Sequence, residues 1–293
     1  MVGAGGIVRK MYLPLLSSWP GIEVVGLTSR RRESYEPLAR AFRLPAVADV
    51  DAGLRLKPDV VFIHSSTDTH SELVVKAMKA GMAVFVDKPL AYHLQEAERV
   101  IEVAASTGRA LLVGFNRRFA PFYVKAKAAI AQPSLIVVEK HRRDQWFGDP
   151  RESLFDDFIH PLDTLLGLSG SIAHAEMIVR EGQTLIQADA GPGRMALMHR
   201  GIAYEGERLS IAGVEGRIEV EDLEHYRHLR LGQTTQENFL SWQSIAWRRG
   251  FQTMIESVEQ VIQGHGRWPI SLDDLFLSHR VVESLAETGS FQA

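Results

Sequence analysis

Short apolar runs alternate with amphipathic segments through the first 120 residues. The runs lie at Glu23–Leu27, Val60–Ile63, Ala83–Val86 and Ala110–Val113. Runs of this length are typical of strands that are buried on both faces of a sheet. Because they alternate with helical patterns, they predict a parallel, doubly wound α/β sheet.

The pattern changes after residue 133. Ser134–His141 reads as a strand, Asp156–Leu168 as a helix, and Ile172–Leu231 as several strands separated by Gly-rich or polar turns. Two amphipathic helices, at about Phe251–Gln263 and Leu272–Glu287, close the chain. This half predicts an α+β domain with a large, mainly antiparallel open sheet.

A chain of 293 residues exceeds the usual size of one compact domain, so we expect two. The doubly wound domain is predicted over residues 1–120. The α+β domain is predicted over residues 121–293, with the final helices able to pack back on the first domain.

Composition excludes several classes of function. The formal charge is only −3, with dispersed Lys and Arg, so we expect no nucleic-acid partner. No apolar run reaches the roughly 20 residues that cross a bilayer, and no secretory signal is evident, so we expect no membrane partner and a cytoplasmic location. Without cysteine, thiolate chemistry and cysteine metal sites are excluded.

A glycine-rich turn stands at the start of the chain. Gly3, Gly5, Gly6 and Ile7 precede a helical pattern, so backbone amides there can face a pyrophosphate. Val8 replaces the expected final Gly or Ala, and only two residues of the preceding strand are present, so we expect a natural start a few residues upstream and lower stability for a truncated product. The alternative is a glycine-rich loop that binds nothing.

The run at Glu23–Leu27 is followed by Thr28-Ser29-Arg30, where an acidic residue would bind the adenosine ribose of NAD. No acid is present. Ser29 and Arg30 can instead bind a 2′-phosphate, which favours NADP over NAD. The alternative is a solvated basic turn.

Five stretches together resemble the Gfo/Idh/MocA family, and several of them its MviM-like branch. They are His64–His70, Asp87-Lys88-Pro89, Asn116–Phe119, Asp156–His160 and Gly213–Gly216. The resemblance covers essentially the whole chain. It implies a dinucleotide-binding domain followed by a substrate-side sheet domain, and Gly213–Gly216 matches a tight turn between two strands of that sheet.

Asp87-Lys88-Pro89 resembles the family's Glu-Lys-Pro motif, with Asp in place of Glu. The resemblance implies that Lys88 is catalytic and that both Asp87 and Lys88 lie near the nicotinamide. An ammonium there can stabilise alkoxide character on a carbinol oxygen as hydride leaves. The alternative is a surface lysine before a proline turn.

Asp156 and His160 resemble the family's Asp-x-x-x-His motif, and their i,i+4 spacing places both on one helix face. We interpret His160 as an acid/base group and Asp156 as its helper. The alternatives are a structural histidine beside a helix-start acidic pair, or a metal site. Because two candidate ligands do not define a metal site, none is expected.

Further cofactor contacts follow from the resemblance and from strand ends. A polar stretch follows Val60–Ile63 at the edge where doubly wound sheets bind their ligands. Asn116 is expected near the nicotinamide, whereas Arg117 and Arg118 are set aside because they can equally form interdomain ion pairs. The expected contacts from the polar stretch are Ser65, Ser66, Thr67 and His70, although His70 can equally cap or pack the next helix.

On the substrate side, strand alternation places Lys140 and Arg142 on the face opposite Glu139 and His141. The cations either bind a carboxylate or hydroxyl-rich substrate or form an exposed charged strand end. Aromatic side chains in this half can stack on a sugar ring, but they equally fill a core or a dimer interface. They are Trp146, Trp242 and Trp247.

These features predict an NAD(P)-dependent oxidoreductase. It would transfer hydride between the nicotinamide and a secondary alcohol or ketone of a polyhydroxylated small molecule, a sugar, cyclitol or related polyol. Lys88 and His160 are expected to converge on the carbon that exchanges hydride. The alternative is a non-catalytic regulatory protein that senses a dinucleotide or sugar on the same fold. A homo-oligomer, a dimer or dimer of dimers, is expected because a large open sheet leaves an apolar face.

Overall fold

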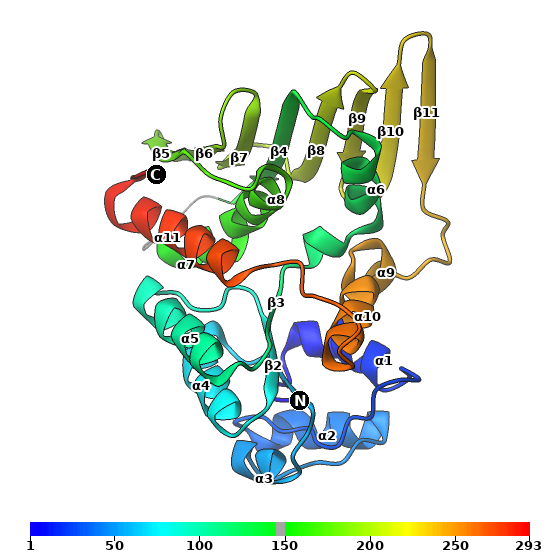
Figure 1. Cartoon of the computed structure of the whole chain (residues 1–293), viewed down its shortest axis with the longest axis vertical. Coiled ribbons are helices and arrows are strands. Elements are labelled where there is room, and N and C mark those ends of the chain that lie inside the picture. The colour runs from blue at the N-terminus through cyan, green and yellow to red at the C-terminus, as the bar shows by residue number, and fades with distance from the viewer. Residues whose placement is uncertain (145–149) are drawn as a thin grey trace. The chain divides into compact units, whose positions relative to one another are not determined.

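The structure, a computed structural model, describes residues 1–144 and 150–293. Within these ranges the chain divides into two compact units, each with its own sheet (Figure 1). The first comprises residues 1–114 and 251–271, and the second comprises residues 115–250 and 272–293.

The first unit is built on a parallel sheet in the order β1-β2-β3, which confirms the predicted doubly wound α/β pattern. Its strands are β1 (Val60–Ile63), β2 (Ala83–Asp87) and β3 (Leu111–Gly114). The helical segments are η1 (Val8–Tyr12, a π-helix), α1 (Leu13–Leu16), α2 (Arg32–Phe42), α3 (Val50–Arg55), η2 (Thr67–Thr69), α4 (His70–Lys79), α5 (Leu94–Thr107) and α10 (Phe251–Ile262).

The strand predicted at Glu23–Leu27 is not formed as such. Only Leu27 and Thr28 pair, in isolated parallel bridges to Ala46 and Val2, and Val2 also bridges to Ile63. Between these two segments, Val2 is the one bridged residue. Its neighbours Met1 and Gly3 add backbone hydrogen bonds to Gly26 and Thr28, but no second pair of bridged residues extends the ladder. An apolar run supplies strand propensity, but the ladder needs a partner of matching length.

Val8 explains why the glycine turn departs from the usual fingerprint. Its side chain is fully buried among Ala4, Leu13, Leu27 and Tyr35. The helix that begins after the turn is π-helical from Val8 to Tyr12, and π-helices have wider turns than α-helices. Val8 therefore contributes to the core at the position where a smaller residue was expected.

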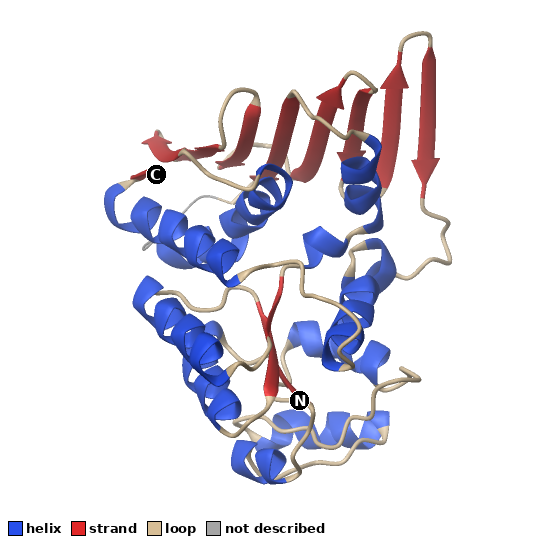
Figure 2. Cartoon of the chain, in the orientation of Figure 1, coloured by secondary structure: helices blue, strands red, loops and turns tan. Residues whose placement is uncertain are grey.

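The second unit contains a mixed sheet in the order β11-β10-β9-β8-β4-β7-β6-β5-β12 (Figure 2). The strand pairings between described residues of this sheet are antiparallel except that of β4 with β7, so the prediction of a mainly antiparallel sheet is confirmed. The strands are β4 (Leu135–Arg142), β5 (His174–Arg180), β6 (Gln183–Asp189), β7 (Arg194–Arg200), β8 (Gly206–Gly213), β9 (Gly216–Glu221), β10 (His225–Arg230), β11 (Gln233–Asn238) and β12 (Ser290–Gln292).

Helices of the second unit pack on one face of this sheet, with α8 lying over β4 and β7 and α6 over β8 and β9 (Figure 2). The predicted tight turn is present: Gly213 of β8 pairs with Gly216 of β9. The helical segments are η3 (Asn116–Phe119), α6 (Pro121–Ala129), α7 (Pro150–Ser153), η4 (Leu154–Phe158, a π-helix), α8 (Ile159–Ser169), α9 (Ile245–Arg248) and α11 (Leu272–Thr288).

Strand β4 carries a charge on its buried face. Ile136, Val138 and Lys140 are all buried, whereas the alternating residues are partly exposed. Period-two alternation places these three side chains on the face that α8 covers. Lys140 therefore occupies a buried position at which the alternation of the strand predicts an apolar residue.

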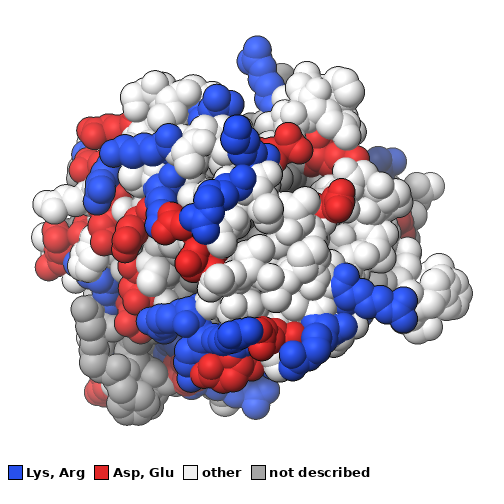
Figure 3. Space-filling model, turned by 90° about the horizontal axis from the view of Figure 1, so that it is seen from below, with Lys and Arg blue, Asp and Glu red and all other residues white. Residues whose placement is uncertain are grey.

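Basic and acidic side chains are intermixed on the face that Figure 3 presents. Within residues 1–144 and 150–293, no helix combines the length and apolarity that a membrane span requires.

Candidate active site

The glycine turn leaves space in front of the first helix. Gly3 has φ of 119°, and a Cβ there would clash with the carbonyl oxygen of His64, so the fold itself requires glycine at this position. At Gly5 and Gly6, by contrast, a Cβ would meet nothing within 4 Å. The residues fit the phosphates of a dinucleotide, because the backbone at these two glycines is open to close approach.

A pocket of about 330 Å³ lies beside Ser29 and Arg30. Arg32 and Glu36, which are ion-paired at 2.5 Å, also line it. Arg30 is exposed and makes no hydrogen bond within the described part of the chain. The pocket thus follows the apolar run at Glu23–Leu27, at the place where the sequence predicts the adenosine ribose and its 2′-substituent.

Asp87, at the end of β2, is held by two side chains. Tyr12 donates its hydroxyl to Oδ1 at 2.7 Å, and His64 Nδ1 lies 2.8 Å from Oδ2. The rings of Tyr12 and His64 are stacked, with centroids 3.9 Å apart. Burial opposes ionisation of Asp87, but the His64 imidazole and both hydrogen bonds lower the pKa of this carboxyl below its ordinary value. The Asp that replaces the family's Glu is therefore an anchored, ionised group.

Lys88 follows directly, and its peptide bond to Pro89 is cis. Buried His70 connects this turn to the loop after β1, since Nδ1 lies 2.9 Å from Pro89 O and Nε2 lies 3.1 Å from Ser65 O. Burial lowers the pKa of His70. These contacts of His70 are with backbone oxygens, which agrees with the alternative that its role is structural. A contact of His70 with a cofactor stays a prediction.

The loop after β1 is stabilised by its own side chains. Thr69 donates through Oγ1 to Ser66 O at 2.8 Å, and the same oxygen lies 2.7 Å from Ser65 Oγ. Ser66 and Asp68 are exposed, and Ser65 and Thr67 are partly so. This loop leaves the carboxyl end of a parallel strand, the edge at which such sheets bind ligands. Cofactor contacts from Ser65, Ser66 and Thr67 stay predictions.

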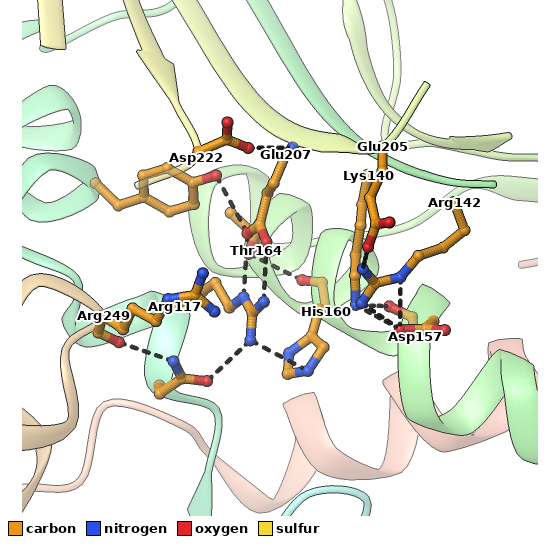
Figure 4. Close-up of polar contacts among 12 residues, drawn as sticks. Arg117, Lys140, Arg142, Asp157, His160, Thr164, Glu205, Glu207, Asp222 and Arg249 are labelled. Atoms are coloured by element: carbon orange, nitrogen blue, oxygen red, sulfur yellow. Dashed lines mark hydrogen bonds and ion pairs between the residues drawn. The ribbon is translucent and has the colours of Figure 1, made fainter. Parts of the chain in front are cut away.

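In the second unit, Arg117 connects His160 to two neighbours (Figure 4). It pairs with both carboxylate oxygens of Glu207, at 3.1 and 2.9 Å, and also donates to Asn116 Oδ1 at 3.1 Å. Its NH1 lies 3.2 Å from His160 Nε2. Because a guanidinium has only donors, this contact is a hydrogen bond only when Nε2 carries no proton.

Asn116 is buried, and both ends of its amide are engaged within this unit. Nδ2 donates to Arg249 O at 2.8 Å, and Oδ1 accepts from Arg117. A contact of Asn116 with nicotinamide stays a prediction.

Asp157, the neighbour of the predicted Asp156, is the centre of a cationic cluster. Its oxygens accept from Lys140 Nζ at 2.8 Å, from Arg142 at 3.0 Å and from Arg200 at 2.7 Å. Burial opposes ionisation, but Lys140 and Arg142 lower the pKa of Asp157 well below its ordinary value. Asp156 is exposed on η4, and its role beside His160 stays a prediction.

The pKa of Lys140 is lowered from 10.5 to about 7. Burial is the main cause and the neighbouring Arg117 adds to it, while Asp157 acts in the opposite direction. A lysine with this pKa changes its charge near neutral pH.

The predicted alternation along β4 is confirmed. Lys140 and Arg142 line one pocket of the second unit, and Glu139 and His141 line a different one together with Arg208. Of the predicted aromatic residues, Trp242 is exposed and Trp247 packs against Phe239 at 5.0 Å. Trp146 lies outside the described residues.

Arg117 and Arg118 both form ion pairs inside the second unit. Arg118 donates to Asp163 at 2.7 Å and to Asp274 at 2.9 Å, and all three belong to that unit. Lys88 belongs to the first unit and His160 to the second. That both act on one substrate stays a prediction. In the described ranges, no group of three or more His, Cys, Asp or Glu is arranged to hold a metal.

Sequence reasoning missed Arg117, Asp157 and the burial of Lys140. Their partners come from η3, β4, η4, β7 and β8, which are distant along the chain. One feature of the sequence could have indicated the burial of Lys140. It lies at alternate positions with Ile136 and Val138, so it faces the same side of the strand as these two apolar residues.

Comparisons with known proteins agree with this architecture. Residues 1–115 match a family model described as "Oxidoreductase family, NAD-binding Rossmann fold", and residues 121–230 match "YceM-like, C-terminal domain". The chain is 33% identical to the putative oxidoreductase YceM of Salmonella typhimurium over 97% of this chain and 95% of that protein.

Two further relatives extend the comparison. The scyllo-inositol 2-dehydrogenase (NAD(+)) of Bacillus subtilis is 28% identical over 77% of this chain and 74% of its own length. The crystal structure of the dehydrogenase MviM from Clostridium difficile superimposes with a TM-score of 0.89 at 26% identity and covers 97% of both chains. The chain belongs to the Gfo/Idh/MocA family of oxidoreductases.

Proposed function

We propose that this protein is an NADP-preferring dehydrogenase or reductase that acts on a CH–OH group of a sugar, cyclitol or related polyol. The similarity to an enzyme named as an inositol dehydrogenase supports the substrate class. The cofactor preference rests on this chain's own Ser29 and Arg30.

The observation that carries the proposal is the anchoring of Asp87 at the carboxyl end of β2. Tyr12 and His64 hold its carboxylate from two sides, at 2.7 and 2.8 Å. Lys88 therefore leaves the sheet from a fixed point at the edge where doubly wound folds bind their ligands. A preorganised ammonium at such an edge is suited to stabilising a developing alkoxide.

Three segments of the first unit would supply the cofactor contacts. The open backbone at Gly5 and Gly6 would hold the pyrophosphate, and the pocket beside Ser29 and Arg30 would hold the adenosine ribose with a 2′-phosphate. When bound, the nicotinamide supplies hydride transfer. Ser65, Ser66 and Thr67 would add hydrogen bonds from the loop after β1.

Two side chains would handle the proton. Lys88 would donate a hydrogen bond to the carbinol oxygen and withdraw charge from it in the transition state. His160 accepts from Arg117 at Nε2, which requires its proton on Nδ1 in the neutral ring. In this tautomer Nδ1 can donate a hydrogen bond to a substrate oxygen. To transfer a proton, the ring would have to leave Arg117 and be protonated at Nε2 as well; the imidazolium would then give its Nδ1 proton to the substrate oxygen during reduction, and the remaining neutral ring, protonated at Nε2, would take a proton back at Nδ1 during oxidation.

The test combines cofactor binding with turnover. Purified protein is titrated with NADPH and NADH by fluorescence, and is then assayed by nicotinamide absorbance against a panel of inositols and sugars with both cofactors. The proposal expects tighter binding of NADPH and oxidation of at least one polyol. Tighter NADH binding would overturn the cofactor preference. Cofactor binding without any turnover, accompanied by polyol-dependent binding to another macromolecule, would favour a sensor.

A further inference from the structure

A polar pocket of about 210 Å³ lies entirely within the second unit. It is smaller than the roughly 300–1,000 Å³ of typical small-molecule sites, so it suits one end of a ligand. Its lining consists mainly of charged side chains, which are labelled in Figure 4. These side chains are Arg117, Lys140, Arg142, Glu205, Glu207, Asp222 and Arg249.

Lys140 has a donor to spare in this pocket. Its side chain is only 4% exposed, and its ammonium donates to Asp157 Oδ1 at 2.8 Å and to Asp157 O at 3.3 Å. These are its only acceptors within the described ranges, whereas the protonated amine, the main form below pH about 7, has three N–H donors. A buried donor without an acceptor is costly, so the third N–H is best satisfied by a molecule in the pocket.

Asp222 offers the pocket a hydrogen-bond acceptor. One carboxylate oxygen, Oδ1, accepts from the backbone N–H of Glu207 at 2.9 Å, and the other oxygen has no hydrogen bond to the described residues. Both oxygens of Glu207, by contrast, are taken by Arg117. The pocket therefore offers an open donor on Lys140 and an open acceptor on Asp222.

The charges of the pocket balance. Four basic side chains line it, and four carboxylates oppose them: Glu205, Glu207, Asp222 and, behind Lys140, Asp157. Arg117 pairs with Glu207, and Arg142 pairs with Glu205 at 2.5 Å. Arg200, the remaining partner of Asp157, is itself paired with Asp144. Because these charges balance, an added carboxylate would leave one negative charge in the pocket uncompensated, whereas a hydroxyl adds no charge and can both accept and donate.

We propose that this pocket is a subsite for an uncharged, hydroxyl-bearing end of the substrate, in which one hydroxyl accepts from Lys140 and another donates to Asp222. Lys140 is thus a specificity-determining residue that selects neutral polyols over the corresponding sugar acids. This inference rests on the proposed function for the polyol class, but it assigns a new site to residues outside the predicted catalytic set.

The experiment measures binding separately from turnover. Calorimetry on the full chain at a pH below about 7, where Lys140 carries its proton, with and without saturating NADPH, compares myo-inositol, D-glucose and D-glucuronate. D-Glucose and D-glucuronate form a matched pair, because they differ by a hydroxymethyl group and a carboxylate. Wild-type protein is expected to bind at least one neutral polyol more tightly than D-glucuronate.

Lys140→Met removes the donor and the charge while keeping the length of the side chain. Loss of a hydrogen bond to a charged donor is expected to weaken polyol binding about tenfold or more. Lys127→Met is the matched control, since Lys127 is an exposed lysine of the same unit and donates to a backbone oxygen, Gly167 O, away from the pocket lining. It should bind as the wild type does.

Asp222→Asn keeps the inference falsifiable if Lys140→Met fails to fold. Asn tolerates the positive φ of residue 222, which is 50°, and removes one of the opposing acids. The ratio of D-glucuronate to D-glucose affinity should rise in this variant. Four outcomes would each overturn the subsite. Two concern the wild type: it binds D-glucuronate more tightly than the neutral polyols, or it binds no neutral polyol at millimolar concentration. The other two concern the variants: the affinity ratio is unchanged in Asp222→Asn, or the two lysine variants bind polyol with equal affinity. The expected binding order without turnover would leave the subsite standing and remove the redox proposal.

Discussion

His64 Nδ1 lies 2.8 Å from Asp87 Oδ2 in the first unit, and the His64 side chain is fully buried. This pair, together with the Tyr12 hydroxyl, fixes the residue before Lys88. The replacement of the family's Glu by Asp is therefore accompanied by two partners that reach the shorter side chain. Asp87 is also a stability determinant, because its carboxylate is ionised and largely removed from water.

Tyr12→Phe should lower the free energy of unfolding by about 1.5–3 kcal/mol, the usual contribution of a hydrogen bond to a charged group. Urea unfolding at neutral pH measures it. Tyr35→Phe is the control, since Tyr35 is equally buried but its hydroxyl has no hydrogen bond to any described residue. If both variants lose the same stability, the Tyr12–Asp87 hydrogen bond contributes nothing specific.

Lys88→Ala and His160→Ala should each lower turnover of a polyol about 10²–10⁴-fold, the range associated with a general acid or base. Cofactor affinity, measured by NADPH fluorescence, should stay close to that of the wild type. Lys79→Ala, at the exposed end of α4, controls for removal of a lysine from the same unit. Wild-type turnover in either active-site variant would contradict the assigned role.

The regular elements were largely predictable from the sequence, because they depend on local pattern. Apolar runs such as Val60–Ile63 coincide with β1, and the helix predicted from Phe251 is α10. The run at Glu23–Leu27 has the same propensity but pairs only at Leu27 and Thr28, since the neighbouring segment contributes Val2 as its one bridged residue. Strand formation there depends on a partner that no local pattern describes.

The cluster of cations around Asp157 was less predictable from the sequence, because it too depends on how the strands pair. The motif resemblance indicated Asp156, yet the carboxylate that gathers Lys140, Arg142 and Arg200 belongs to Asp157. Those three cations come from β4 and β7, which pair in parallel with Lys140 opposite Met198 and Arg142 opposite Arg200. Strand register decides which cations reach the helix, and register is a property of the folded sheet.

Arg30→Ala should weaken NADPH binding about 10- to 100-fold and leave NADH binding nearly unchanged. The reason is that the guanidinium would lose a charge-assisted contact that only the 2′-phosphate provides. Arg31→Ala is a closely matched control, because Arg31 is an exposed neighbour that does not line the pocket containing Ser29 and Arg30. Parallel losses for both cofactors would instead indicate a general electrostatic effect.

His279 should make the fold acid-sensitive. Its ring is fully buried in α11, and burial lowers its pKa from 6.5 to about 4 despite a hydrogen bond between Nδ1 and Leu275 O at 2.7 Å. Between these two pH values the unfolded chain binds a proton and the folded chain does not. Stability is therefore lost as the pH falls from about 6.5 to about 4, by up to about 3 kcal/mol.

Urea unfolding at about pH 7.5 and about pH 4.5 tests this linkage. His279→Leu should be less sensitive to pH than the wild type across this window, because its side chain no longer titrates in the unfolded chain. His265→Leu should retain the wild-type sensitivity, since His265 is exposed. Carboxylates with lowered pKa values, such as Asp87 and Asp157, lose their contribution at lower pH and in all three proteins alike. An identical loss of stability in the wild type and His279→Leu would show that the buried imidazole takes up its proton in the folded state as readily as in the unfolded chain.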